Sequence, residues 1–134
     1  MTYEQKADFL RLYTDNTVKL HGLALEVERW RQIAESTGAN MDGMPRGAGT
    51  GGKVENAAVN AAAIVREIEL EIEAAYAERQ QVKEIIQTVP RRKRQILELH
   101  YINGMRPGDI ANQYGKSEKW IRQMLRDAVN SLNI

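Results

Sequence analysis

Residues 117–126 concentrate polar and charged side chains on positions that a helix would turn outward, with Trp120, Ile121, Met124 and Leu125 turned inward or sideways. Arginine suits the paired acceptors of guanine, glutamine suits adenine, and glutamate accepts from the amino group of cytosine. Any solvated helix also carries charges outward, so the neighbouring residues must decide between base recognition and solvation. The predicted base-reading residues are Ser117, Glu118, Lys119, Arg122 and Gln123.

The spacing of residues 107–126 is that of a helix-turn-helix. Ala111 falls at the fifth position, where a small side chain lets two helices cross closely, and Ile121 falls at the fifteenth, where it fills the core between them. Gly115 stands at the ninth position and suits a left-handed turn. Ser117 is a good N-cap for the second helix. This pattern favours DNA contact over mere solvation.

Charge is distributed unevenly along the chain, whose formal net charge is only +1. Residues 1–52 carry −1 and residues 53–89 carry −3, whereas residues 90–134 hold 9 basic and 4 acidic side chains, a net +5. A basic C-terminal end on an otherwise weakly acidic chain is typical of an electrostatic footprint for nucleic acid.

A basic run follows Pro90, which suits the first turn of a helix. Basic groups there oppose the helix dipole, and a DNA phosphate would reverse that penalty. A solvated basic patch or a surface for docking a polymerase are the alternatives. The predicted phosphate contacts are Arg91, Arg92, Lys93, Arg106, Lys116 and Arg126.

Residues 93–132 resemble region 4 of sigma-70-type transcription initiation factors, the module that reads the −35 promoter element. The matching segments are 96–101 (ILELHY), 109–111 (DIA), 114–117 (YGKS) and 121–124 (IRQM). The resemblance implies that Arg122 and Gln123 touch DNA. Glu118 and Lys119 stand where the family usually has a basic residue followed by an acidic one, so a different target sequence is expected.

Two long helices are predicted before this region, over residues 2–35 and 53–88, separated by a Gly-rich loop at 37–52. Apolar residues recur along both at steps of three and four. In the first helix they are Leu10, Tyr13, Thr17, Leu20, Ala24, Val27, Trp30 and Ala34. In the second they are Val54, Ala58, Ala61, Val65, Ile68, Ile72, Ala75, Arg79, Val82, Ile86 and Val89.

These patterns predict an all-α protein, in which a long antiparallel, coiled-coil-like hairpin (residues 1–89) precedes a helix-turn-helix domain (residues 90–134). Two helices cannot enclose a core, so burial against a second copy is expected, giving a homodimer with a four-helix core. The apolar stripe could instead dock on a polymerase subunit. The loop could also let the two helices separate and swap between subunits.

Several classes of function find little support. Cysteine is absent, no residues suggest a metal or cofactor site, and no nucleophile and base are placed together, so we expect a non-enzyme. Residues 47–53 fit the GxxxxGK phosphate-loop spacing, but Val54 replaces the required Ser or Thr and no strand precedes them. No apolar run reaches the roughly 20 residues that span a bilayer. The first residues are too polar for a secretory signal, and the cytoplasm is the expected compartment.

The overall order, long helices, Gly-rich loop and region 4-like end, resembles the small sigma-like regulators of phages and prophages that switch on late, packaging or lysis genes. This resemblance implies a sequence-specific transcription regulator that binds double-stranded DNA at promoters with host RNA polymerase, in a bacterial cytoplasm. The alternative is an oligomeric DNA-packaging adaptor like a terminase small subunit. A third interpretation is a purely structural coiled coil that ignores DNA.

Overall fold

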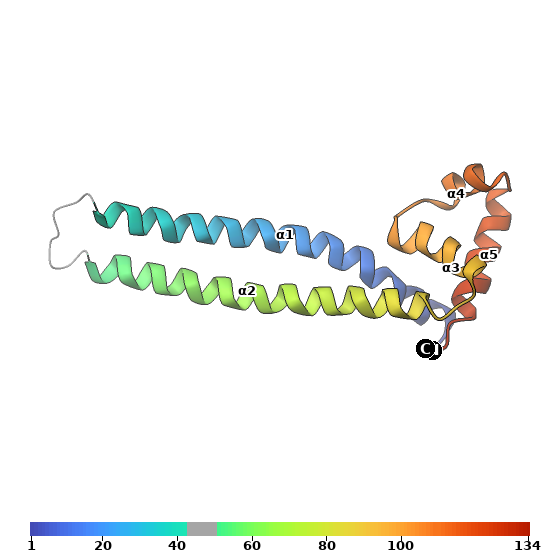
Figure 1. Ribbon diagram of the computed structural model, residues 1–134, viewed down its shortest axis with the longest axis horizontal. Helices are drawn as coiled ribbons and strands as arrows, with labels where there is room; N and C mark the ends of the chain where they lie inside the picture. Colours follow the sequence, from blue (N-terminus) through green and yellow to red (C-terminus); the bar gives the residue numbers. More distant parts are fainter. Residues whose placement is uncertain (43–50) are drawn as a thin grey trace. The chain divides into compact units, whose positions relative to one another are not determined.

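The computed structural model describes the backbone of residues 1–42 and 51–134 and the side chains outside residues 37–58. All the regular secondary structure of the described residues is helical, as predicted (Figure 1). Its elements are α1 (Tyr3–Asp42), α2 (Gly51–Ile86), α3 (Arg91–Leu97), a π-helical turn η1 (Glu98–Ile102), α4 (Pro107–Tyr114) and α5 (Glu118–Asn130). None of the helices in this part of the chain is long and apolar enough to cross a membrane.

The helices reach further into the predicted Gly-rich loop than the sequence suggested. α1 continues to Asp42 and α2 already begins at Gly51, so the prediction of a loop at residues 37–42 and at 51–52 is wrong. Residues 37–42 contain a single glycine, and one glycine costs a helix only about 1 kcal/mol. The rest of that loop, and with it most of the phosphate-loop pattern, lies outside the described residues.

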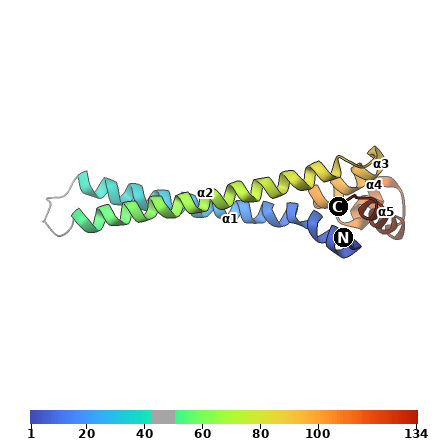
Figure 2. The same cartoon turned by 90° about the horizontal axis from the view of Figure 1, so that it is seen from below.

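The described chain packs as two compact units. The first comprises residues 1–18 and 76–134, and the second comprises residues 19–75. Both chain ends therefore belong to the first unit, where the two termini lie close together in both views (Figures 1 and 2). The predicted division into residues 1–89 and 90–134 remains an interpretation of the sequence.

The first unit has one hydrophobic core to which all its helices contribute. The ends of α1 and α2 supply fully buried side chains to it, among them Leu10 and Val82. The buried residues are Leu10, Tyr13, Val82, Ile86, Val89, Ile96, Leu97, Tyr101, Ile110, Ala111, Ile121, Leu125, Ala128, Val129 and Leu132. The helix-turn-helix thus shares its core with residues from the beginning of the chain.

Polar contacts fix how α1 meets α2 in this unit. The Arg79 guanidinium lies over the Tyr13 ring, 4.5 Å from its centroid, and Nη2 donates to the Tyr13 hydroxyl at 2.7 Å. One turn further along α1, the buried Asn16 donates from Nδ2 to Glu78 Oε2 at 2.7 Å. The contacts on α2 move to lower residue numbers as those on α1 move to higher ones, so the two helices are antiparallel here, as predicted.

The second unit holds a thinner core of Leu23, Val27 and Ile68. The partly buried Trp30, Ile64, Val65 and Ile72 surround it. An exposed ion pair joins the helices, Arg31 Nη2 to Glu69 Oε1 at 3.1 Å.

The predicted stripe of α1 is wrong at two positions. Asn16 and Leu23 are buried, whereas the predicted Thr17 and Ala24 are exposed. Burying Leu23 removes more apolar surface from water than burying an alanine would. Thr17 bonds within its own helix instead, its hydroxyl donating to the Tyr13 carbonyl at 2.8 Å. The predicted α2 stripe agrees with the buried and half-buried positions from Ala61 to Val89, and its first two members lie outside the described side chains.

Candidate nucleic-acid interface

The turn between α4 and α5 has the predicted geometry. Gly115 takes a left-handed conformation (φ +65°) at the end of α4. The Lys116 amide donates to the Ala111 carbonyl at 3.0 Å and closes the turn. Ser117 then caps α5, its hydroxyl oxygen accepting from the Trp120 amide at 3.1 Å. The left-handed turn at Gly115 and the N-cap at Ser117, both predicted from the sequence, are confirmed.

The two helices of the motif cross over small and branched residues. Ala111 is buried on α4, and Ile121 on α5 is completely buried. Ile110 fills the space beside them, also without exposure. Because the core lies on this side of α5, its opposite side is free for contact with another molecule.

The predicted base-reading residues all lie exposed within the first two turns of α5 or directly before it. They differ in the hydrogen bonds that their side chains make within the protein. Glu118 Oε1 accepts from Arg122 Nη2 at 2.6 Å and from Arg122 Nε at 3.2 Å. Gln123 Nε2 donates to Asp127 Oδ1 at 3.1 Å, and the Ser117 hydroxyl serves as the cap.

The Glu118–Arg122 ion pair is weak because both side chains are more than half exposed. An exposed pair four residues apart on a helix contributes about 0.3–0.5 kcal/mol. A bidentate contact to a base contributes about 1–3 kcal/mol of discrimination. A guanine could therefore draw Arg122 out of this pair at little cost, and until then the pair limits the conformations of both side chains.

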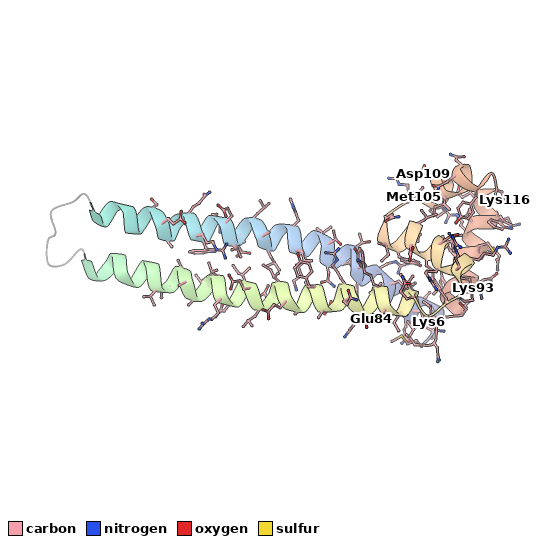
Figure 3. The ribbon with its side chains drawn as sticks, in the orientation of Figure 1. Lys6, Glu84, Lys93, Met105, Asp109 and Lys116 are labelled. Atoms are coloured by element: carbon pink, nitrogen blue, oxygen red, sulfur yellow. The ribbon has the colours of Figure 1, made fainter. Side chains whose placement is uncertain are left out.

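The predicted phosphate contacts lie in three places. Arg91 and Arg92 are exposed in the first turn of α3. Lys93, labelled in Figure 3, follows them and is half-buried. Arg106 is the exposed residue that precedes α4. The last group comprises Lys116 and Arg126, which stand before and on α5.

Aromatic rings engage both cations of the last group. The Lys116 ammonium lies 5.5 Å from the centroid of the Trp120 ring. The Arg126 guanidinium lies 5.1 Å from the ring centroid of Tyr3, at the start of α1. A cation–π contact of this kind keeps the side chain charged and limits the positions that the charged group can take.

Arg94 has a different role from its basic neighbours. Its Nη2 donates to the Val89 carbonyl at 3.3 Å and lies 3.5 Å from the Gln87 carbonyl. These are unsatisfied carbonyls just past the end of α2, which a basic side chain can cap. Residue type could not separate Arg94 from the three cations before it, because the direction of its side chain depends on the turn at Pro90.

Three residues near or on α5 were missed by the sequence reasoning. Trp120, expected to turn inward or sideways, is exposed to 36%. Tyr3 stacks under Arg126, and Lys6 Nζ donates to the Leu132 carbonyl at 2.7 Å and the Asn130 carbonyl at 3.1 Å. The N-terminal residues thus cap and brace the helix that carries the predicted base-reading groups.

Among the described residues, Tyr101 is the titratable group whose pKa departs clearly from its ordinary value. Burial raises the pKa of its phenol, Tyr3 raises it further, and Arg11 opposes the shift. The phenol therefore stays neutral in the folded unit. Among the described residues, no three His, Asp or Glu side chains come together in a group that could hold a metal ion.

Comparison with known protein families matches residues 79–132 to sigma-70, region 4. Neither the curated proteins nor the solved structures yield a match to the chain. The matched segment begins inside α2 at Arg79 and includes α3, α4 and α5, so it contains the helix-turn-helix and all the candidate contacts. Residues 79–132 are therefore a sigma-70 region 4-like helix-turn-helix, a domain of the DNA-binding and non-enzymatic kind.

Proposed function

We propose that the protein is a sequence-specific transcription regulator, derived from a phage, that binds double-stranded DNA at promoters together with host RNA polymerase. One observation carries the proposal: the exposed side of α5, with its cluster of base-reading groups, is presented by a helix-turn-helix that matches sigma-70 region 4. The same match supports a polymerase partner. The phage origin and the bacterial cytoplasm rest on the resemblance of the whole chain to small phage regulators.

In the proposed mechanism α5 enters the major groove with its N-terminal turns facing the base edges. Arg122 and Gln123 read a guanine and an adenine, while Glu118 and Lys119 contact neighbouring bases together with Ser117. Cations around the groove bind phosphates and fix the register without reading sequence. These cations are Arg91, Arg92, Lys93, Arg106, Lys116 and Arg126.

Sequence-specific binding is tested by selecting duplexes from a random pool and measuring their affinity by fluorescence anisotropy across salt concentrations. We expect one enriched motif and a linear log–log salt dependence with a slope of about −0.9 per phosphate neutralised. A steep slope without any enriched motif would contradict sequence-specific regulation and favour DNA packaging. No binding at any salt would favour the structural coiled coil.

Arg122 provides the sharpest variant for this experiment. Arg122→Ala should weaken binding to the selected motif by about 1–3 kcal/mol and relax the choice of base at one position. Arg66→Ala is the matched control, because it removes the same charge from an exposed position on α2 outside the first unit. If both variants lose affinity equally, with base preference unchanged, Arg122 acts only through its charge and the proposed docking is wrong.

We also propose that the protein is a homodimer formed through the long helices. Support comes from the second unit, where Leu25, Val59 and Leu70 are each more than 60% exposed around a core of only a few residues. Apolar exposure of this kind on helices favours association. Sedimentation equilibrium tests it: a dimer agrees with the regulator, whereas a ring of eight or more subunits would point to a packaging adaptor.

A further inference from the structure

Trp120, with 36% of its surface accessible, is the most exposed large apolar side chain among residues 90–134, all of which the structure describes. The core beside it is already filled by Ile121 and Leu125, both buried. The exposed part of the indole forgoes the stabilisation that burial would give. The exposed part of the Trp120 ring is therefore available for contact with another molecule.

The position of Trp120 is well defined. Its backbone amide donates to the Ser117 hydroxyl at 3.1 Å, which places it in the capped first turn of α5. The Lys116 ammonium lies over its ring at 5.5 Å. Backbone and ring are thus both restrained before any ligand arrives, which lowers the entropy lost on binding.

Trp120 also lies beside the residues proposed to read bases. Residues three apart are neighbours on a helix surface, so Trp120 and Gln123 share a side of α5. At about 100° per residue, the side opposite the buried Ile121 falls between Trp120 and Lys119 and includes Gln123. The N-terminal turn of a recognition helix is the part that meets base edges in the major groove.

We propose that Trp120 contacts the 5-methyl group of a thymine in the major groove and so selects T over C at one position of the site. The thymine methyl is the apolar group that the major groove displays, and an exposed, restrained indole is matched to it. Gln123 on the same side suits adenine, which favours a site that combines A and T at neighbouring steps. This inference rests on the proposed DNA-binding function.

Removal of single methyl groups tests the contact. In the motif obtained by selection, each thymine is replaced in turn by deoxyuridine, which deletes the methyl and keeps the base pairing. We expect one such replacement to weaken binding of the unaltered protein about fourfold, the effect of one buried methyl group. Trp120→Ala should bind the thymine and deoxyuridine duplexes equally, while Trp30→Phe, changed at the other tryptophan, should keep the fourfold difference.

Fluorescence gives a second readout. In Trp30→Phe the remaining emission comes from Trp120, and it should change when the selected duplex is added. Thermal unfolding of Trp120→Ala must show that the variant is folded at the temperature of the binding assay, because only 36% of this side chain is exposed and its loss costs some stability.

The proposal is overturned if every deoxyuridine duplex binds like the original, or if Trp120→Ala keeps the same penalty. It is also overturned if Trp120 emission ignores DNA and responds only to RNA polymerase, which would make the residue a protein contact. In each of these cases the selected motif is still bound, so the proposed function stands. Failure to bind any duplex would refute both.

Discussion

Replacing Leu10 with alanine should destabilise the helix-turn-helix, although Leu10 lies about a hundred residues before α5 in the sequence. Leu10 is completely buried in the core that also contains Ile110 and Ile121. If that core is a single cooperative structure, a cavity made from α1 must weaken the packing under α5 as well.

The magnitude follows from burial. Leu10→Ala removes three carbon groups, each contributing about 0.8 kcal/mol, or roughly 2.5 kcal/mol in transfer free energy. The cavity left behind raises the cost to about 3–4 kcal/mol. A domain has about 5–15 kcal/mol of total stability, so this is a large fraction of it. With a urea dependence of about 1.5 kcal/mol per molar, the midpoint should fall by about 2 M.

Urea unfolding in a Trp30→Phe background measures this effect, because emission then reports Trp120 on α5 alone. Val18→Ala is the control: an apolar side chain on the same helix is shortened to alanine at a position that is 69% exposed and is not among the residues that support the proposed dimer. We expect it to change the free energy of unfolding by less than about 0.5 kcal/mol. An unchanged Trp120 transition in Leu10→Ala would refute the single core and make the C-terminal helices an independent domain.

Three further predictions concern stability. Because burial raises the pKa of Tyr101 above its usual value near 10, the unfolded chain loses this proton first; stability should fall as pH rises through about 10, and Tyr101→Phe should flatten that slope in urea titrations. Lys6→Met should cost about 1 kcal/mol in thermal unfolding, since the ammonium caps carbonyls at the end of α5, whereas Lys19→Met, exposed on the same helix, should cost almost nothing. Gly115→Ala should destabilise by about 1–2 kcal/mol because of its positive φ, whereas Gly108→Ala in α4 should stabilise by up to about 1 kcal/mol, since an added methyl there meets no atom closer than 3.8 Å.

Each of these predictions has a result that contradicts it. Equal alkaline slopes with and without the Tyr101 hydroxyl would assign the pH dependence to other groups. Equal costs for the two lysine variants would mean that the ammonium of Lys6 caps nothing. If Gly115→Ala and Gly108→Ala changed the stability in the same direction, the backbone conformation of the glycine would not determine the change.

The helix-turn-helix could be predicted almost residue by residue because its signals are local. Gly115 forms the turn that ends α4, and the Ser117 hydroxyl caps the amide three residues later. Ala111 packs against α5, the next helix in the sequence. Each requirement restricts the residue type at a fixed offset, so the spacing alone reveals it. The α2 stripe was predictable for the same reason, since buried positions recur every three or four residues.

Contacts between distant segments could not be predicted in this way. Asn16 can be buried because its side-chain amide donates a hydrogen bond to Glu78 on the other helix. Asparagine and glutamate are polar residue types, so the sequence gives no sign of this burial. Lys6 and Tyr3 read as ordinary polar residues at the start of a chain, yet they cap and brace α5. The starting point of the loop was wrong because the glycine-rich composition was extended to residues 37–42, where only one glycine stands.

Residue type selected the candidate base-reading groups, whereas the structure shows which of them already have a side-chain partner. Lys119 is exposed, whereas Arg122 is hydrogen-bonded to Glu118. In the proposed complex, Arg122 must either break this bond or contact the base together with Glu118. If Glu118 and Arg122 contact the base together, replacing both side chains should weaken DNA binding by less than the sum of the two single replacements. The order of Glu118 and Lys119, reversed in sign from the usual region 4 pattern, then has a physical meaning: it places the acid four residues before the arginine, where a helix lets them pair.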